Sequence, residues 1–180
     1  MKIRKITGRE IFDSRKTPTI ECIIELDEGF KVSASVPSGA SVGQHAVLEL
    51  RDEDPRRFNG KGVLNAIKNL EQKIAPILVG RTPDLKLMDQ EMIDLDGTAN
   101  KSNLGANAIL SASMAIAKAQ AFVLDVELYE FIHQTYQVGE KSLPHCMVNI
   151  LNGGMHADNG IAFQEFMIMP TGEISMEDMM

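Results

Sequence analysis

The loop after Pro37 is the first segment whose residue types could do chemistry. Residues 38–43 read Ser-Gly-Ala-Ser-Val-Gly, so they offer hydroxyls and open backbone N–H groups to an anion or a metal ion. These side chains are too small to pack a core. The segment is therefore either a plain flexible loop or a loop that closes over a ligand.

A second group of polar residues lies between two expected helices. It comprises Asp94, Asp96, Asn100, Lys101 and Asn107. Carboxylate and amide oxygens would suit a cation site. However, Gly97 is of the type that ends helices, and Asp and Asn commonly cap the start of the next one. The sequence favours this structural interpretation over a metal site.

The third group combines His156, in a Gly-rich loop, with Gln164 and Glu165 in an apolar run. Glu165 stands between Phe163 and Phe166. A carboxylate in such a run is costly to bury unless it is paired or takes part in chemistry. The alternatives are a glutamate at a strand end that faces water, or one that pairs with a structural lysine. These residues alone leave both interpretations open.

Hydrophobic periodicity indicates the elements that must position these groups. Residues 19–26 and 30–36 alternate apolar and polar side chains around a turn at Gly29, which predicts an antiparallel hairpin with one buried face. A third strand is expected around residues 3–6. Helical spacing predicts a helix over 63–78 that ends or kinks at Pro76, a helix from an N-cap at Thr82 to Gly97, and helices over 104–121 and 127–136.

A polar segment over residues 138–142 predicts a boundary. Beyond it, the apolar runs 146–151 and 163–169 predict two strands joined by a polar loop. Ser175 and Asp178 resemble the start of a helix. We expect one domain over residues 1–139 and the beginning of a second over 140–180.

Composition indicates a globular chain and excludes several classes. The 180 residues are 44% hydrophobic and 24% charged, which is enough to bury a core. Eighteen Lys and Arg against 25 Asp and Glu give a net charge of −7, which disfavours nucleic acid as a partner. No signal peptide and no membrane span are predicted. Cys22 and Cys146 are expected to be reduced, as in the cytoplasm.

Several long motifs together resemble the enolase family, in matching order and spacing over essentially the whole chain. In the first domain they are Asp13-Ser14-Arg15, Val36-Pro37-Ser38-Gly39-Ala40-Ser41, Leu48-Glu49-Leu50-Arg51-Asp52, Gly60-Lys61-Gly62-Val63, Asp94-Leu95-Asp96-Gly97-Thr98 and Leu104-Gly105-Ala106-Asn107. Beyond the boundary they are residues 149–154, His156-Ala157 and Gln164-Glu165-Phe166-Met167-Ile168.

The resemblance implies an α+β amino-terminal capping domain, with a three-stranded antiparallel sheet and helices. The start of a modified α/β (TIM-like) barrel follows it, truncated after two strands. It also implies a lyase, phosphopyruvate hydratase, that reversibly dehydrates 2-phosphoglycerate to phosphoenolpyruvate in glycolysis and gluconeogenesis. Two Mg²⁺ ions per site, a homo-oligomer (dimer or octamer) and a cytoplasmic location, with a surface or secreted pool, are family expectations.

Residue by residue, the resemblance assigns roles in this site. Ser41 resembles the loop serine that binds the second Mg²⁺, and Ala40 would contact substrate through its backbone. His156 matches the loop histidine that reaches over the substrate. Gln164 and Glu165 match the strand pair beside the reacting centre, where Glu165 would help the hydroxyl leave as a catalytic residue.

The chain also departs from the family pattern. Lys16 stands at a usual glycine, Val42 at a usual threonine, and Ala46 and Ala99 at usual glutamates. The family's metal carboxylates, base lysine and phosphate-binding residues belong to later barrel segments, so we expect residues 1–180 alone to be inactive. The alternative from another class is a non-catalytic binding module that keeps the capping domain.

Overall fold

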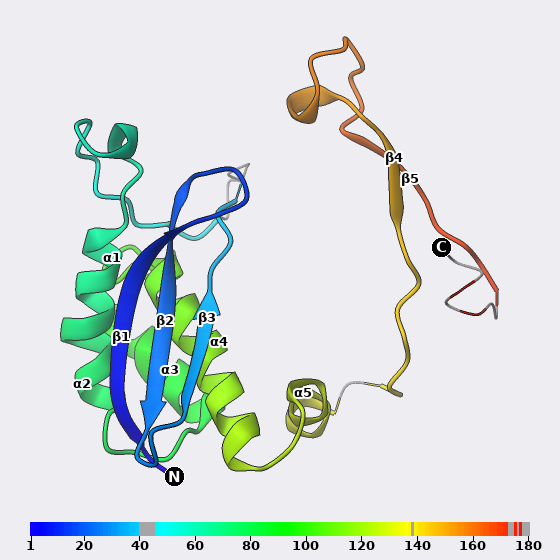
Figure 1. The fold of residues 1–180 in the computed structure, drawn as a ribbon. Helices are drawn as coiled ribbons and strands as arrows, with labels where there is room; N and C mark the ends of the chain where they lie inside the picture. Colours follow the sequence, from blue (N-terminus) through cyan, green and yellow to red (C-terminus); the bar gives the residue numbers. More distant parts are fainter. Residues whose placement is uncertain (40–45, 138, 173–174, 176, 178–180) are drawn as a thin grey trace. The chain divides into compact units, whose positions relative to one another are not determined.

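The computed structural model describes residues 1–39, 46–137, 139–172, 175 and 177. The chain forms two compact units, Met1–Gln137 and Val138–Met180. Figure 1 shows the elements of both.

The first unit is built on a three-stranded antiparallel sheet in the order β1-β2-β3. The strands are β1 (Ile3–Phe12), β2 (Pro18–Leu26) and β3 (Lys31–Ser35). In the register, Cys22 of β2 lies between Gly8 of β1 and Ala34 of β3. The predicted hairpin and third strand are therefore present, and the third strand extends beyond the short run expected for it.

The central strand β2 is buried more completely than an amphipathic hairpin would be. Ile20, Cys22 and Ile24 point into the core and are fully buried, as the alternation predicts. Thr19 and Glu21 on the opposite face are also buried. Glu21 is covered because the side chain of Arg9, on neighbouring β1, forms an ion pair with it. The expectation of only one buried face was wrong for this strand.

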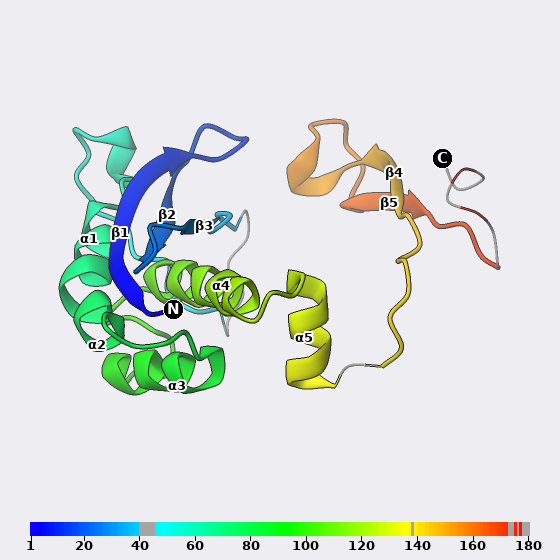
Figure 2. The same ribbon diagram turned by 60° about the horizontal axis from the view of Figure 1, so that its bottom comes forward.

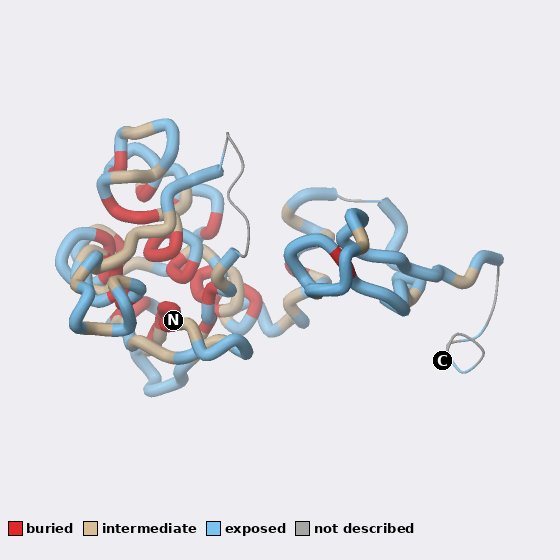
Figure 3. Tube along the Cα trace, turned by 90° about the horizontal axis from the view of Figure 1, so that it is seen from above, coloured by how far each residue is buried: buried red, intermediate tan, exposed pale blue. Residues whose placement is uncertain are grey.

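In chain order the helices of this unit are η1 (Phe58–Gly60), α1 (Leu64–Asn69), the π-helical turn η2 (Leu70–Ile74), α2 (Ala75–Leu78), α3 (Leu85–Asp96), α4 (Ala106–Val123) and α5 (Leu128–Tyr136). Helix α4 and the segment from α1 to α2 cover one face of the sheet, as Figure 2 shows in the turned view. Helix α4 contacts β2 and β3, and α3 packs on α4. The buried residues gather between these layers (Figure 3).

The structure refines two predicted helix details. Pro76 was expected to end or kink its helix, and the first alternative is wrong, because the helical segment over residues 64–78 continues through Pro76 to Leu78. The π-helical turn η2 directly precedes that proline. The N-cap of α3 is Asp84 rather than Thr82, since the Asp84 side chain accepts a hydrogen bond from the Leu87 N–H at 3.2 Å.

Helix α4 is the core helix of the first unit. It is long and apolar enough to suit a membrane span by length and composition alone. However, small residues such as Ala108, Ala112 and Ala115 are fully buried, and these residues let the helix lie close to its neighbours. Its apolar character is thus explained by packing inside this unit.

The second unit contains an antiparallel strand pair, β4 (Val148–Asn152) and β5 (Glu165–Ile168), and a short 3-10 turn, η3 (Gly154–His156). Both strands are shorter than the apolar runs that predicted them, and all their residues are exposed. The predicted helix at Ser175 and Asp178 lies partly outside the described residues. The predicted domain bounds, 1–139 and 140–180, stay a prediction about the complete protein.

Candidate functional site

The five predicted site residues lie in two places. Ala40 and Ser41 belong to the loop after Pro37 and fall outside the described residues. His156, Gln164 and Glu165 belong to the second unit, where η3 and the start of β5 carry them.

The backbone brings the His156 loop against the start of β5. The Gly153 N–H donates to the Gln164 carbonyl oxygen at 2.9 Å, and the Gly154 N–H donates to that of Ile161 at 2.7 Å. A side chain at Gly153 would meet the Phe163 carbonyl oxygen at 2.5 Å, so only glycine permits this approach. The Gly-rich composition of the loop therefore serves to place His156 near the Gln164–Glu165 pair.

Glu165 is the first residue of β5 and lies opposite Asn152 of β4. It is exposed in this unit, as are His156 and Gln164. Within the described residues of this unit β4 and β5 pair only with each other, and all residues of both strands are exposed. The suggestion that Glu165 is a buried carboxylate therefore finds no support in this unit, whereas a glutamate at a strand end that faces water matches its position.

One asparagine side chain, that of Asn159, organises the loop, and no role was predicted for it. It donates to the Asn152 carbonyl oxygen at 2.8 Å, and its own side-chain oxygen accepts from the Ile161 N–H at 3.2 Å. Asparagine commonly bonds the backbone two residues on in turns, so an Asn in a Gly-rich loop was the available signal. These bonds join the end of β4 to the segment that leads into β5.

In the first unit, Ser38 is fixed where the Ser38–Gly43 loop begins. The Arg15 guanidinium donates to the Ser38 carbonyl oxygen. The Ser38 hydroxyl accepts from the Arg51 guanidinium at 2.9 Å and donates to a Glu49 carboxylate oxygen at 3.2 Å. These side chains, with Thr17 and Lys61, line a hollow of about 460 Å³. Arg15 and Arg51 belong to motifs that resemble the enolase family, but no role was predicted for either side chain.

From residue 46, where the described chain resumes, residues 48–50 are hydrogen-bonded to the segment that connects α3 to α4. The Leu48 N–H donates to the Asn100 carbonyl oxygen at 2.7 Å, and the Ala106 N–H donates to that of Leu48 at 2.8 Å. The Asn107 side chain bonds Leu50 twice, accepting from its N–H at 3.1 Å and donating to its carbonyl oxygen at 3.0 Å. The Asn107 side chain is buried, and its amide bonds both backbone groups of Leu50, as a neighbouring strand would.

The carboxylate of Asp96 organises this connection. It is buried, and its oxygens accept from the Thr98 N–H at 3.0 Å, the Thr98 hydroxyl and the Leu104 N–H at 2.7 Å. Burial raises the pKa of Asp96, but these hydrogen bonds outweigh burial and hold the pKa below its ordinary value. Gly97 ends α3 with a left-handed conformation, as predicted.

The polar residues of this segment do not cap α4, which was expected of them. The N-cap of α4 is Gly105, and it makes no side-chain capping bond. The structural interpretation of the segment nevertheless agrees with these contacts, because the side chains of Asp96 and Asn107 bond backbone groups of the chain itself, and Asp96 also bonds the Thr98 hydroxyl. The described residues contain no group of three or more His, Cys, Asp or Glu side chains that could hold a metal ion.

Comparison with known proteins identifies the two units. The family model described as "Enolase, N-terminal domain" matches residues 3–132, and "Enolase, C-terminal TIM barrel domain" matches residues 140–180. The enolase of Anaplasma phagocytophilum (strain HZ) is 48% identical over 178 residues, which is 98% of this chain. The chain belongs to the enolase family.

The predicted family and fold class are thereby confirmed. The three-stranded sheet and helices are those of an enolase amino-terminal domain, and β4 and β5 fall within the match to the enolase barrel. The chain spans 41% of the length of the Anaplasma enolase. Family membership implies a metal cofactor, but the described residues do not supply a site that fits one by themselves.

Proposed function

We propose that this chain is the amino-terminal part of an enzyme that interconverts 2-phosphoglycerate and phosphoenolpyruvate. The observation that carries the proposal is the match of residues 3–132 and 140–180 to the two enolase domains, which includes the loop and strand that bear His156, Gln164 and Glu165. The reaction is a dehydration: a proton leaves the carbon beside the carboxylate, and a hydroxyl leaves the neighbouring carbon.

In this proposal Glu165 assists departure of the hydroxyl. A carboxyl group beside a leaving hydroxyl can hydrogen-bond it and supply the proton with which it leaves as water. The position of Glu165, exposed at the first residue of β5 and next to the His156 loop, supports this role because a substrate can reach it. Gln164 would orient the substrate, and His156 would reach over it.

The loop of Ser38–Gly43 would supply the capping domain's part of the site. Ala40 would contact substrate through its backbone, and Ser41 would offer its hydroxyl to a metal ion. The hydrogen bonds from Arg51 to Ser38 and between Asn107 and Leu50 support this assignment, because they fix the chain before and after the proposed contacts. Fixed flanks reduce the entropy lost when a loop engages its ligand.

We propose Mg²⁺, two ions per site, as the metal, with its carboxylate ligands in barrel segments that follow residue 180. Hard divalent ions of this kind neutralise negative charge on an oxygen-rich substrate. The base that takes the carbon-bound proton would lie in the same later segments. The activity is thus proposed for the complete polypeptide, in a cytoplasmic homo-oligomer, and residues 1–180 alone should not catalyse the reaction.

The role of Glu165 can be tested in a chimera of residues 1–180 and the segment of the Anaplasma enolase that follows its match. Glu165→Gln keeps the shape and removes the proton that titrates, so kcat should fall by about 10²–10⁴ with a smaller change in KM. Asp158→Asn is the matched control, since Asp158 is exposed in the same loop and has no proposed role. A normal kcat for Glu165→Gln would contradict the assignment.

A further inference from the structure

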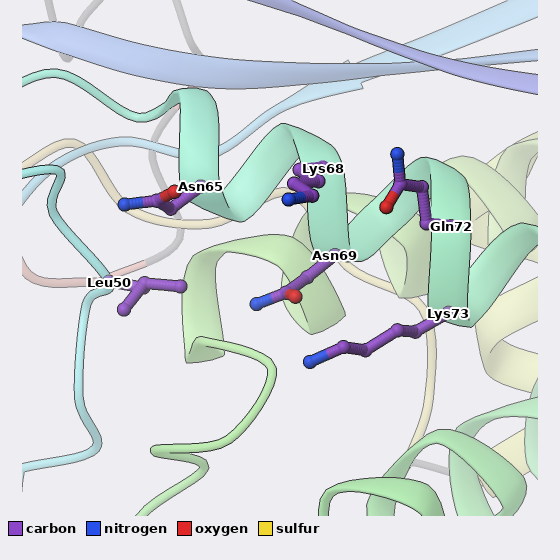
Figure 4. A pocket seen from close by; sticks show the side chains of 6 residues that line it. All are labelled: Leu50, Asn65, Lys68, Asn69, Gln72 and Lys73. Carbon is purple, nitrogen blue, oxygen red and sulfur yellow. The ribbon is translucent and has the colours of Figure 1, made fainter.

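A groove on the first unit is lined by two lysines, Lys68 and Lys73, and by no acidic residue. Figure 4 shows the side chains that line it, which belong to Leu50, Asn65, Lys68, Asn69, Gln72 and Lys73. Its volume is about 320 Å³, which suits a small molecule or part of one. No acidic residue is among these lining residues, although the chain as a whole has a net charge of −7.

The π-helical turn η2 helps to bring the two lysines to one face. Residues five apart in an α-helix are separated by about 140° around the axis, so Lys68 and Lys73 would diverge in a regular helix. A π-helical turn bonds residue i to residue i+5, and here the Ala75 N–H donates to the Leu70 carbonyl oxygen. The wider turn between them reduces this divergence. Figure 4 shows Asn69 and Lys73 extending in the same direction from neighbouring turns.

The other polar contacts leave these ammonium groups available. Asn69 donates to the carbonyl oxygen of Leu104 at 2.9 Å, which fixes the groove wall against the segment before α4. Glu71 accepts from the Gly8 N–H at 3.0 Å and so serves the sheet instead of the lysines. Within the described part of the chain, the ammonium groups of Lys68 and Lys73 take part in no side-chain hydrogen bond and no ion pair, while their backbone groups belong to α1 and η2.

We propose that this groove binds the phosphate group of a small molecule. Ammonium groups are compact point charges that suit phosphate oxygens, and the amides of Asn65 and Gln72 can donate further hydrogen bonds. Leu50 forms an apolar wall for the rest of the ligand. The groove is lined by none of the five residues of the candidate site, so the proposal does not depend on the enolase reaction.

The test titrates the ¹⁵N-labelled 180-residue chain with inorganic phosphate and with glucose 6-phosphate while amide resonances are followed. Both should give saturable shifts at residues 65–73, and the sugar phosphate should bind more tightly if Leu50 contacts it. The double variant Lys68→Gln/Lys73→Gln should weaken binding by about tenfold, since each exposed charge pair contributes up to about fivefold. Lys5→Gln is the control, because Lys5 is exposed on β1 and is not among the residues that line the groove.

Three outcomes would overturn the proposal. Shifts that do not saturate would show only general attraction of anions. Equal weakening by Lys5→Gln would show that net charge, and not the groove, governs binding. Shifts at residues 65–73 that an acidic peptide causes and phosphate does not would assign this face to a protein partner.

Discussion

Asp96→Asn should destabilise the first unit because the buried carboxylate accepts three hydrogen bonds at the end of α3. The amide keeps the shape but places an NH₂ group where one carboxylate oxygen was. If that group faces the Leu104 N–H, a buried donor loses its acceptor, which costs about 1–3 kcal/mol. The two bonds from Thr98 also lose their charge assistance, about half of their strength.

These effects add to a loss of about 2–4 kcal/mol, a large part of the 5–15 kcal/mol that is typical of a folded domain. With a urea m-value of about 2 kcal/mol/M, the unfolding midpoint of the 180-residue chain should fall by about 1–2 M. Far-ultraviolet circular dichroism would follow the transition. Asp94→Asn is the control on the same helix, since the exposed Asp94 carboxylate accepts one side-chain hydrogen bond within the described residues, from Gln90, and the change should alter stability by less than about 0.5 kcal/mol.

The same carboxylate predicts a pH dependence. Its pKa in the folded chain is lower than its ordinary value of 3.8, so its contribution is fully present above that pH. The contribution is lost as the pH falls below 3.8 and through the folded pKa, and the difference between wild type and Asp96→Asn should shrink there. A midpoint for Asp96→Asn within about 0.5 M of wild type at neutral pH would refute the role of this carboxylate.

Three further predictions concern single side chains of the first unit. Asn107→Ala removes both hydrogen bonds to the Leu50 backbone and should lower the free energy of unfolding in urea by about 2–3 kcal/mol. An unchanged free energy of unfolding would mean that these bonds do not fix residues 48–50. Asp89→Asn should stabilise the chain at neutral pH, because burial raises the pKa of Asp89 despite the hydrogen bond from Ser113. The extra stability of the variant should disappear as the pH falls through this raised pKa. Equal stability of variant and wild type at neutral pH would contradict the prediction. In a Cys146→Ser background, iodoacetamide at pH 8 should label Cys22 only after unfolding, since burial and then Glu21 raise the pKa of its thiol to about 12; rapid labelling of the folded chain would contradict this.

Much of the first unit could be predicted because its signals are local. The alternation of Ile20, Cys22 and Ile24 predicted the central strand, and all three are fully buried. The stripe of Met88 and Met92 predicted α3, and Gly97 predicted where it ends. These patterns depend only on spacing along the chain, so a single sequence suffices to read them.

The features that were missed depend on contacts between distant residues. Glu21 is buried because its partner on the neighbouring strand β1 is Arg9, which forms an ion pair with it. The alternation of residues along one strand cannot reveal such a partner. The clamp of Arg51 on Ser38 and that of Asn107 on Leu50 join segments far apart in the sequence. Pro76 follows a π-helical turn, and no sequence period indicates such a turn.

The sequence and the structure each reveal only part of the candidate site. Motifs predicted Gln164 and Glu165 as a pair, and the structure adds that Gly153 and Asn159 place the His156 loop beside them. The apolar neighbours of Glu165 suggested a buried carboxylate, but in the described unit those neighbours are exposed as well. The roles of Ala40 and Ser41 stay predictions that depend on the resemblance.

The most direct test of the account compares phosphoenolpyruvate formation by two purified proteins supplied with 2-phosphoglycerate and Mg²⁺. One is residues 1–180, and the other is the chimera in which the following segment of the Anaplasma enolase completes the barrel. The account predicts that the chimera forms phosphoenolpyruvate, while residues 1–180 give no more than a protein-free blank. Product formed by residues 1–180 alone, or a folded chimera without activity, would contradict it.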